Sequence, residues 1–166
     1  MTRLTRPDPA RLAALVESCR AAPEPFRAVQ DALAEAVGFR LFTMMVIDWA
    51  AGEAARIWSN MPESYPVQGR KPLGRMTGWG RHVLEGRQPW IGRDAQDIAW
   101  AFFDHELIVR LGCASCLNQP VIDGDRVIGT INMLHEAGWY DEADAAVAAP
   151  FAALLVPHFR AWAARG

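Results

Sequence analysis

The stretch from Cys113 to Leu134 constrains the fold more than any other part of the chain. It contains two short runs rich in Val, Ile and Leu, separated by the polar break Asp123-Gly124-Asp125. An Asp-Gly break between two such runs is typical of a β-hairpin. The second run, Arg126 to Leu134, is nearly all apolar, so we expect a strand covered on both faces, with helices on each side of the sheet. Pro120 lacks an N–H, which suits a sheet edge, a strand end or a bulge.

Several shorter elements are predicted before this hairpin. Asp8-Pro9 places an N-cap residue before a proline at the first helical position, and Pro25 can open a second helix that ends at Gly38. The later elements follow from apolar runs and from the Gly and Pro residues between them. They are strands over residues 39–48 and 54–60, a loop over 61–73, a short helix over 78–86, a brief strand over 88–91, and two short helices within 97–111.

The last part of the chain predicts a helix with a break. Asp141 is placed to cap this helix, and Asp144 lies three residues later, in the position of a capping box. Pro150 and Pro157 both fall inside the apolar pattern that follows. Because an interior proline costs about 3 kcal/mol, we expect either two helical segments or one kinked helix.

The bulk composition excludes several classes of protein. With 51% hydrophobic and 22% charged residues, the 166-residue chain has the composition of one globular domain rather than a disordered one. A net charge of −2 argues against a nucleic-acid-binding protein that relies on a basic face. The sequence has three Cys without a framework of spacings, no apolar leader at its start, and no apolar run of about 20 residues. We therefore expect a cytoplasmic protein that binds neither nucleic acid nor a membrane.

The hairpin residues also carry a resemblance. A Ser-x-x-x-x-Pro strand that meets a Val-Ile-Gly strand resembles the central hairpin of GAF domains, and Tyr140-Asp141 supports the match at the start of the last helix. The matching hairpin positions are Ser115, Pro120, Val121, Gly124, Val127, Ile128 and Gly129. The resemblance implies one α+β domain over residues 1–166, with a core at about 26–159. It implies a central antiparallel sheet of five to six strands, with terminal helices on one face and short helices and loops covering a pocket on the other.

The same resemblance implies a sensory or regulatory protein that binds a small molecule. It names neither the ligand nor a cofactor, so both stay unknown. We expect this domain to act without a fused output domain and to form a homodimer through its terminal helices. The apolar stripe available for that contact is Phe151, Leu155, His158 and Trp162. The alternatives are a small cysteine-dependent redox enzyme and a dimeric interaction module with a filled core and no ligand.

The pair Cys113 and Cys116 is the basis of the redox alternative. A thioredoxin-type C-x-x-C motif needs its first Cys at a helix N-terminus, whereas this motif enters a predicted strand. Structural or pocket-lining thiols are the favoured interpretation, with redox and zinc-binding roles left open. One group of GAF proteins, the free methionine-(R)-sulfoxide reductases, works through cysteines beside the pocket. The positions that match those cysteines are Thr77 and Ile108 here, so the resemblance does not favour this activity.

Aromatic and polar side chains are the candidate ligand-binding residues. Seven aromatic residues lie in or beside segments that face the pocket in GAF domains: Trp58, Tyr65, Trp79, Trp90, Trp100, Phe102 and Phe103. They either pack the core or line an aromatic pocket for a flat or cationic ligand. Asn is depleted in strands, so two Asn in paired strands predict either an edge position or polar groups that orient a ligand. The predicted ligand-binding residues are Trp58, Tyr65, Trp79, Trp100, Phe103, His105, Cys116, Asn118 and Asn132. Trp90 is assigned to the core.

Overall fold

A single six-stranded antiparallel sheet forms the centre of the molecule, which we describe from a computed structural model that covers Arg3 and residues 5–165. The strands are β1 (Leu41–Asp48), β2 (Glu53–Ser59), β3 (Lys71–Pro72), β4 (Trp90–Gly92), β5 (Ser115–Asp123) and β6 (Arg126–His135). Their order across the sheet is β3-β2-β1-β6-β5-β4, and every neighbouring pair is antiparallel. The predicted fold class is confirmed.

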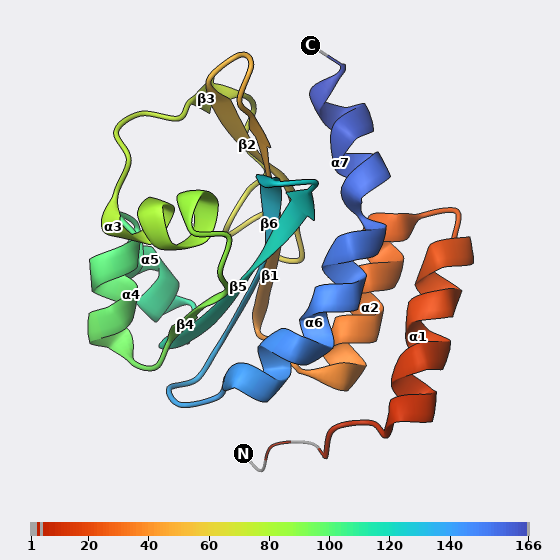
Figure 1. Cartoon of the computed structure of the whole chain (residues 1–166). Helices are drawn as coiled ribbons and strands as arrows, with labels where there is room; N and C mark the ends of the chain where they lie inside the picture. The colour runs from red at the N-terminus through yellow and green to blue at the C-terminus, as the bar shows by residue number, and fades with distance from the viewer. Residues whose placement is uncertain (1–2, 4, 166) are drawn as a thin grey trace.

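Helices cover both faces of this sheet (Figure 1). On one face, which we call the helical face, lie α1 (Pro9–Ala21), α2 (Pro25–Ala36), α6 (Glu142–Leu154) and α7 (Val156–Ala163). On the other, the cavity face, lie α3 (Gly78–Gly80), the π-helical turn η1 (Arg81–Glu85), α4 (Ala95–Ala101) and α5 (His105–Arg110). The two predicted short helices within residues 97–111 are α4 and α5.

The predicted hairpin is the pair β5–β6. Its turn contains Gly124 with a φ of +65°, in the left-handed region that glycine adopts at no steric cost. Pro120 lies in β5 opposite Thr130, beyond the part of β5 that pairs with β4. That side of the strand has no neighbour there, so the missing N–H leaves no ladder hydrogen bond unmade. A bulge follows between Val121 and Ile122.

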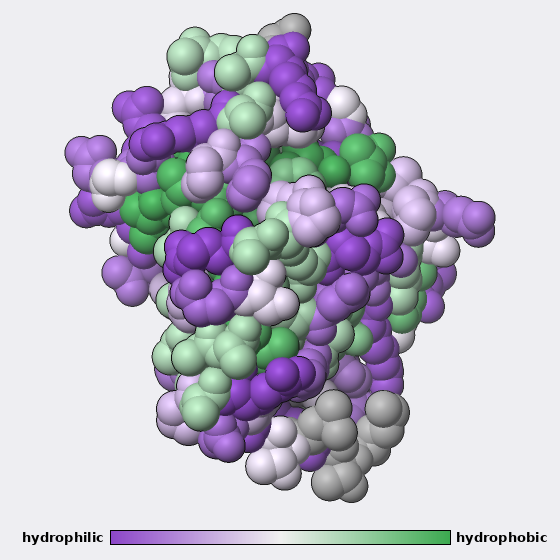
Figure 2. Space-filling model, turned by 90° about the vertical axis from the view of Figure 1, so that its right-hand side faces the viewer, coloured by the Kyte–Doolittle hydropathy of each residue, from purple (hydrophilic) through white to green (hydrophobic). Residues whose placement is uncertain are grey.

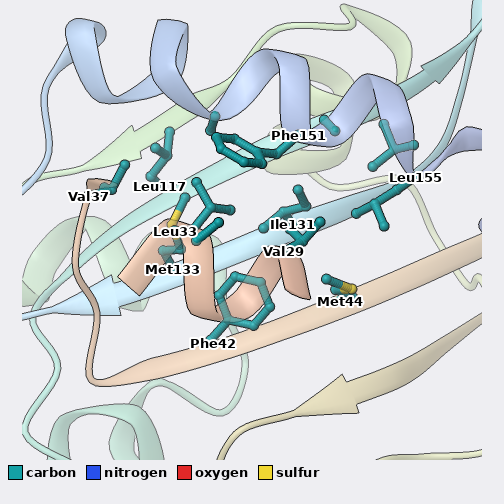
Figure 3. Close-up of a cluster of buried hydrophobic side chains, with 14 of the residues drawn as sticks. Val29, Leu33, Val37, Phe42, Met44, Leu117, Ile131, Met133, Phe151 and Leu155 are labelled. Carbon is teal, nitrogen blue, oxygen red and sulfur yellow. The ribbon is translucent and has the colours of Figure 1, made fainter. Parts of the chain in front are cut away.

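The main core lies between the sheet and the helices of the helical face (Figure 3). Alternate residues of the strands point into it, as the period of two requires. Its fully buried members include Leu33, Phe42, Met44, Leu117, Ile131, Met133, Phe151 and Leu155. Phe151 and Leu155 were expected on a surface stripe for dimer contact, and that expectation is wrong. Both side chains point into the protomer's own core, so they are not available to a second copy.

The predicted break in the last helix is confirmed, and it lies next to Pro157 rather than at Pro150. The chain bends by 54° between α6 and α7. Pro157 falls in the first turn of α7, where its missing N–H is not needed, whereas Pro150 is accommodated inside α6. In the described part of the chain no single helix is long and apolar enough to cross a membrane. The bent α6–α7 pair passes that test only by length and composition.

The N-terminal segment is held against the start of α6 by charge. Asp141 caps the helix and forms the predicted capping box with Asp144. The Asp144 carboxylate is fully buried; its Oδ1 accepts hydrogen bonds from Arg6 Nε (3.0 Å) and from the guanidinium of Arg3. Its Oδ2 accepts the backbone N–H of Asp141 at 2.9 Å. A buried carboxylate with both oxygens used in this way fixes Arg3 and Arg6 against the start of α6.

Arg70 joins the loop before β3 to the end of α7. Its Nη2 donates to the carbonyl oxygens of Ala163 (2.7 Å) and Trp162 (3.2 Å), and its guanidinium lies over the Trp162 ring. These carbonyls belong to the last turn of α7, where the Trp162 carbonyl also accepts the backbone N–H of Arg165 at 3.2 Å. Seen from the side of the helices, the surface is spread with hydrophilic side chains, and strongly hydrophobic ones are visible only in small patches (Figure 2).

Candidate functional site

A cavity of about 340 Å³ opens between the cavity face of the sheet and the segments that cover it. The strands provide Thr43, Met45, Ala54, Ala55, Arg56, Asn118, Asn132 and Leu134. The loop between β2 and β3 provides Tyr65, Gln68 and Gly69, and β3 provides Lys71. The helices and turns of the cavity face provide Thr77, Trp79, Ala101, Phe102, Phe103, Asp104 and Ile108. Most of this surface is apolar, and the polar groups are concentrated in two places. Such a mixture is typical of a small-molecule site.

The first set of polar side chains forms a row across β1, β6 and β5. Thr43 of β1 lies opposite Asn132 of β6, and Asn132 lies opposite Asn118 of β5. Residues in direct register point to the same face of a sheet, with Cβ atoms about 5 Å apart. The row is therefore a consequence of strand pairing, and three polar residues from distant parts of the sequence become neighbours.

Hydrogen bonds join this row into one chain, which we call the polar ladder: Trp79, Asn118, Asn132 and Thr43. Trp79 Nε1 donates to Asn118 Oδ1 (2.9 Å), Asn118 Nδ2 donates to Asn132 Oδ1 (2.7 Å), and Asn132 Nδ2 donates to Thr43 Oγ1 (3.1 Å). Asn118 and Thr43 are buried, whereas Asn132 is partly accessible. Because each member holds the next, the amide groups have fixed positions before any ligand arrives.

The second polar group lies at the other side of the cavity. The Tyr65 hydroxyl donates to Asp104 Oδ2 at 2.6 Å, and the Arg56 guanidinium lies over the Tyr65 ring at 3.8 Å from its centroid. Burial and the hydrogen bond to Asp104 raise the pKa of Tyr65 far above its usual value, so the phenol stays protonated. Lys71 adds an exposed ammonium group at the rim.

Aromatic rings of α3 and of the segment after α4 form one wall of the cavity. Trp79 and Phe102 lie against each other with ring centroids 6.0 Å apart. Phe103 follows and leaves 95% of its surface in solvent while still lining the cavity. Of the nine predicted ligand-binding residues, the structure brings five to the cavity lining: Tyr65, Trp79, Phe103, Asn118 and Asn132.

Trp58 lies on the opposite face of the sheet. Met44 pairs with Trp58 and Met45 pairs with Arg56, so Ile57 is an extra residue between the two pairs. Such a bulge reverses the alternation of faces, and it places Arg56 in the cavity but Trp58 among the helices. There the indole Nε1 donates to Gln30 of α2 at 2.8 Å. Strand alternation alone places Trp58 on the cavity face, and the bulge is why this is wrong.

Trp100 and His105 lie outside the lining as well. Trp100 is 61% exposed on α4 and stacks on Trp90, with ring centroids 5.8 Å apart. The Trp100 ring also covers Gly78, where an added Cβ would meet it at 2.8 Å. His105 begins α5 and is half-buried beside Asp104. These short helices turn their first residues and their outer faces away from the cavity, which helical spacing alone did not reveal.

The cysteines lie beneath the cavity rather than in it. Cys113 and Cys116 are buried and free of disulfide bonds. Cys116 donates its Sγ–H to Asn118 Oδ1 at 3.3 Å, so it supports the polar ladder without lining the cavity. Burial raises the pKa of both thiols, most strongly that of Cys116. Among the residues that the structure describes, no three His, Cys, Asp or Glu side chains gather as metal ligands.

Several cavity residues were not predicted from the sequence. Thr43 lies in an apolar run, and only its pairing with β6 shows that it faces Asn132. Arg56, Lys71 and Asp104 carry no local pattern that marks them as cavity residues. Only the loop containing Lys71 gave a usable indication, because the resemblance implied that residues 61–73 cover a pocket. Thr77 and Ile108, the two positions that match the reductase cysteines, do line the cavity.

A second hollow, of about 630 Å³, lies between β4 and α6 and shares no lining residue with the cavity. Its walls include His82, Arg93 and Glu142, and its lining includes the buried side chain of Gln119. Gln119 Oε1 has no hydrogen-bond partner among the described residues. Arg93 and Glu142 pair with each other at 3.0 Å, so the charges at this hollow already satisfy one another.

The same substitution at two buried threonines is expected to have opposite effects. Thr130 Oγ1 is buried without a partner in the described structure, whereas Thr43 Oγ1 accepts from Asn132. Thr130→Val should raise the free energy of unfolding by about 1 kcal/mol, because it removes an unsatisfied hydroxyl. Thr43→Val should lower it by about 1 kcal/mol, because it leaves an amide donor unpaired. Urea denaturation of both variants checks this, and equal losses would contradict it.

Comparison with known proteins identifies relatives of this architecture. The family model described as GAF domain matches residues 21–156. The GAF domain of a Coxiella burnetii phosphoenolpyruvate-protein phosphotransferase has a TM-score of 0.71 and 21% identity, covering 92% of this chain and 94% of that one. The GAF domain of an Acinetobacter phosphoenolpyruvate-protein phosphotransferase has a TM-score of 0.69 and 15% identity, with 95% of each chain covered. The free methionine-R-sulfoxide reductase of Neisseria meningitidis, solved with its substrate, has a TM-score of 0.61 and 19% identity, covering 99% of this chain and 97% of that one. No curated protein matches the chain.

Proposed function

The chain belongs to the GAF domain family, and from that premise we propose that it is a sensory, regulatory module that binds a small molecule in the 340 Å³ cavity. The observation that carries the proposal is the polar ladder. Buried amides in strands cost free energy unless they are hydrogen-bonded, and a core that only needs packing has apolar residues at such positions. Four hydrogen-bonded side chains beside an apolar, aromatic cavity match the composition of sites that orient a ligand.

A thermal-shift screen of the purified protein tests this proposal. The panel contains amines, nucleotides, amino acids and aromatic acids. A compound present at a hundred times its Kd raises the free energy of unfolding by about 2.7 kcal/mol, which is easily detected as a higher Tm. If no compound of the panel raises the Tm of the folded protein, the result would count against ligand binding and favour the interaction module with no ligand.

Two matched tryptophan variants show whether a hit binds in the cavity. Trp79→Phe keeps an aromatic ring but removes the indole N–H that holds Asn118. Trp58→Phe makes the same chemical change on the helical face, where the indole N–H holds Gln30. A ligand in the cavity should lose about tenfold in affinity in Trp79→Phe, as expected for about 1.4 kcal/mol, and little in Trp58→Phe. Equal effects would place the ligand elsewhere.

A cysteine-dependent redox enzyme has less support. The rival function needs a thiolate, and burial raises the pKa of both Cys113 and Cys116. The positions that match the reductase cysteines are occupied by Thr77 and Ile108, neither of which can form a disulfide. Because both thiols stay protonated, Cys113 and Cys116 should react slowly with iodoacetamide at neutral pH. Homodimerisation and a cytoplasmic location stay predictions.

A further inference from the structure

The polar ladder has a direction, and its first member sets that direction. An indole N–H can only donate, so the Asn118 atom that faces Trp79 Nε1 must be the amide oxygen. The amide nitrogen of Asn118 then faces Asn132, whose oxygen accepts, and the nitrogen of Asn132 faces Thr43. No amide in this row is free to flip, because each flip would place two donors or two acceptors against each other.

The direction decides which hydrogen-bonding groups are left for a ligand. Asn118 Oδ1 accepts from both Trp79 and Cys116, so its two lone pairs are used. Each amide nitrogen uses one hydrogen in the ladder and keeps a second. The Thr43 hydroxyl accepts from Asn132, and its own hydrogen has no acceptor among the described residues. The row therefore offers mainly donors.

The charged side chains favour the same kind of ligand. Arg56 and Lys71 both line the cavity, and neither forms an ion pair with a carboxylate in the part of the chain that the structure describes. Arg56 is held in place by the Tyr65 ring and by the carbonyl oxygen of Pro66, 2.7 Å from its Nη1. The one carboxylate in the lining, Asp104, already accepts the Tyr65 hydroxyl. Two cationic side chains and one carboxylate leave the lining with a net charge of +1.

The walls set the shape of the ligand. Trp79 and Phe102 present aromatic surface next to the ladder, and Phe103 extends that surface to the rim. Aromatic rings pack most favourably against other flat groups in offset or edge-to-face geometry. A volume of about 340 Å³ is at the small end of the range for ligand pockets, so one or two fused rings fill it.

We propose that the cavity takes a small aromatic carboxylate, with its ring against Trp79 and Phe102 and its oxygens accepting hydrogen bonds from the polar ladder. This inference rests on the proposed ligand-binding function and gives it a chemical class. A carboxylate provides acceptors only, which is the complement of a donor-rich row, and its charge is favourable beside Arg56 and Lys71. A cationic ligand would meet the same aromatic walls but would place its donors against donors.

Two matched sets of probes test the class by isothermal titration calorimetry. One set is benzoate, benzamide and benzylamine; the other is indole-3-acetate, indole-3-acetamide and tryptamine. Within each set the ring is constant and only the polar group changes. The carboxylate is expected to bind about tenfold more tightly than the amide, because charge-assisted hydrogen bonds are roughly twice as strong as neutral ones. The amine is expected to bind most weakly.

Asn132→Asp is the sharpest variant. An aspartate can still accept from Asn118, and the Thr43 hydroxyl can rotate to donate to it, so the ladder is preserved while its free N–H is replaced by negative charge. Carboxylate affinity should fall by about tenfold or more, and amine affinity should rise. Gln96→Glu makes the same change at an exposed position of α4 outside the lining and should alter neither.

Lys71→Met tests the contribution of charge at the rim. It should weaken carboxylate binding by about threefold and reduce its dependence on salt. An amide or amine that binds as tightly as its carboxylate would overturn the proposed class while ligand binding itself stands. If none of the six probes nor any compound of the thermal-shift panel binds, then the proposed function fails too.

Discussion

Replacing Gly129 with alanine is expected to lower the free energy of unfolding by about 3 kcal/mol. An added Cβ would lie 2.2 Å from the backbone oxygen of Met45 and 2.5 Å from the Phe159 ring. Gly129 lies in β6 with strands on both sides, and Phe159 of α7 is fully buried against it. Neither a paired backbone nor a buried ring can move away freely, so the methyl group separates α7 from the sheet. Urea denaturation followed by circular dichroism measures the loss.

Gly69→Ala is the matched control for this effect. No atom lies within 4 Å of a Cβ built at Gly69, so the same substitution should change the free energy of unfolding by less than about 0.5 kcal/mol. Both variants are compared without ligand, because Gly69 lines the cavity. Similar losses of unfolding free energy in Gly129→Ala and Gly69→Ala would show that the packing of α7 on the sheet does not depend on the close approach of Phe159 to Gly129.

Replacing Asp144 with alanine is expected to lower the free energy of unfolding by about 3 kcal/mol. The substitution removes the second half of the capping box and the buried acceptor of Arg3 and Arg6 together. The two guanidinium groups would keep only Asp141 and backbone acceptors, so the N-terminal segment should detach from α6 at lower urea concentration. Equilibrium denaturation of the variant, followed at low and at high salt, gives the size of the loss.

Two further variants separate the parts of this effect. Asp144→Asn keeps an oxygen for the capping box but removes the charge, so it should lose less than Asp144→Ala. Glu142→Gln neutralises the neighbouring exposed carboxylate, which pairs with Arg93 at 3.0 Å. Exposed pairs contribute little, so this control should change the free energy of unfolding by less than about 1 kcal/mol. An equal loss in Glu142→Gln and Asp144→Asn would mean that burial of Asp144 does not matter.

Local sequence patterns predicted most of the fold. Asp-Gly at residues 123–124 placed the hairpin, and Asp141 with Asp144 placed the capping box. Two prolines predicted the break between α6 and α7, although its position depends on where Pro157 can be tolerated in a helical turn. Each of these features is decided by residues within a few positions of one another, which is why sequence reasoning can find them.

The site depended on contacts that no local pattern encodes. Asn118 and Asn132 were identified because Asn is unusual in an apolar strand, and their strands are joined by a short turn. Thr43 was missed because β1 and β6 are paired across about 90 residues of chain, a separation at which register depends on the whole sheet. Trp58 was placed on the wrong face because a bulge at Ile57 has no glycine or proline to mark it.

The Arg70 side chain links the loop beside the cavity to the end of α7, two parts of the structure that are far apart in the sequence. Its chain neighbours Gly69 and Lys71 line the cavity, while its own side chain holds the final carbonyls of α7. A molecule that binds only when this loop is in place also stabilises the last turn of α7, and it disfavours fraying there. Thermodynamic reciprocity then requires the converse: whatever holds the end of α7 in its helical form must raise the affinity of the cavity by the same factor.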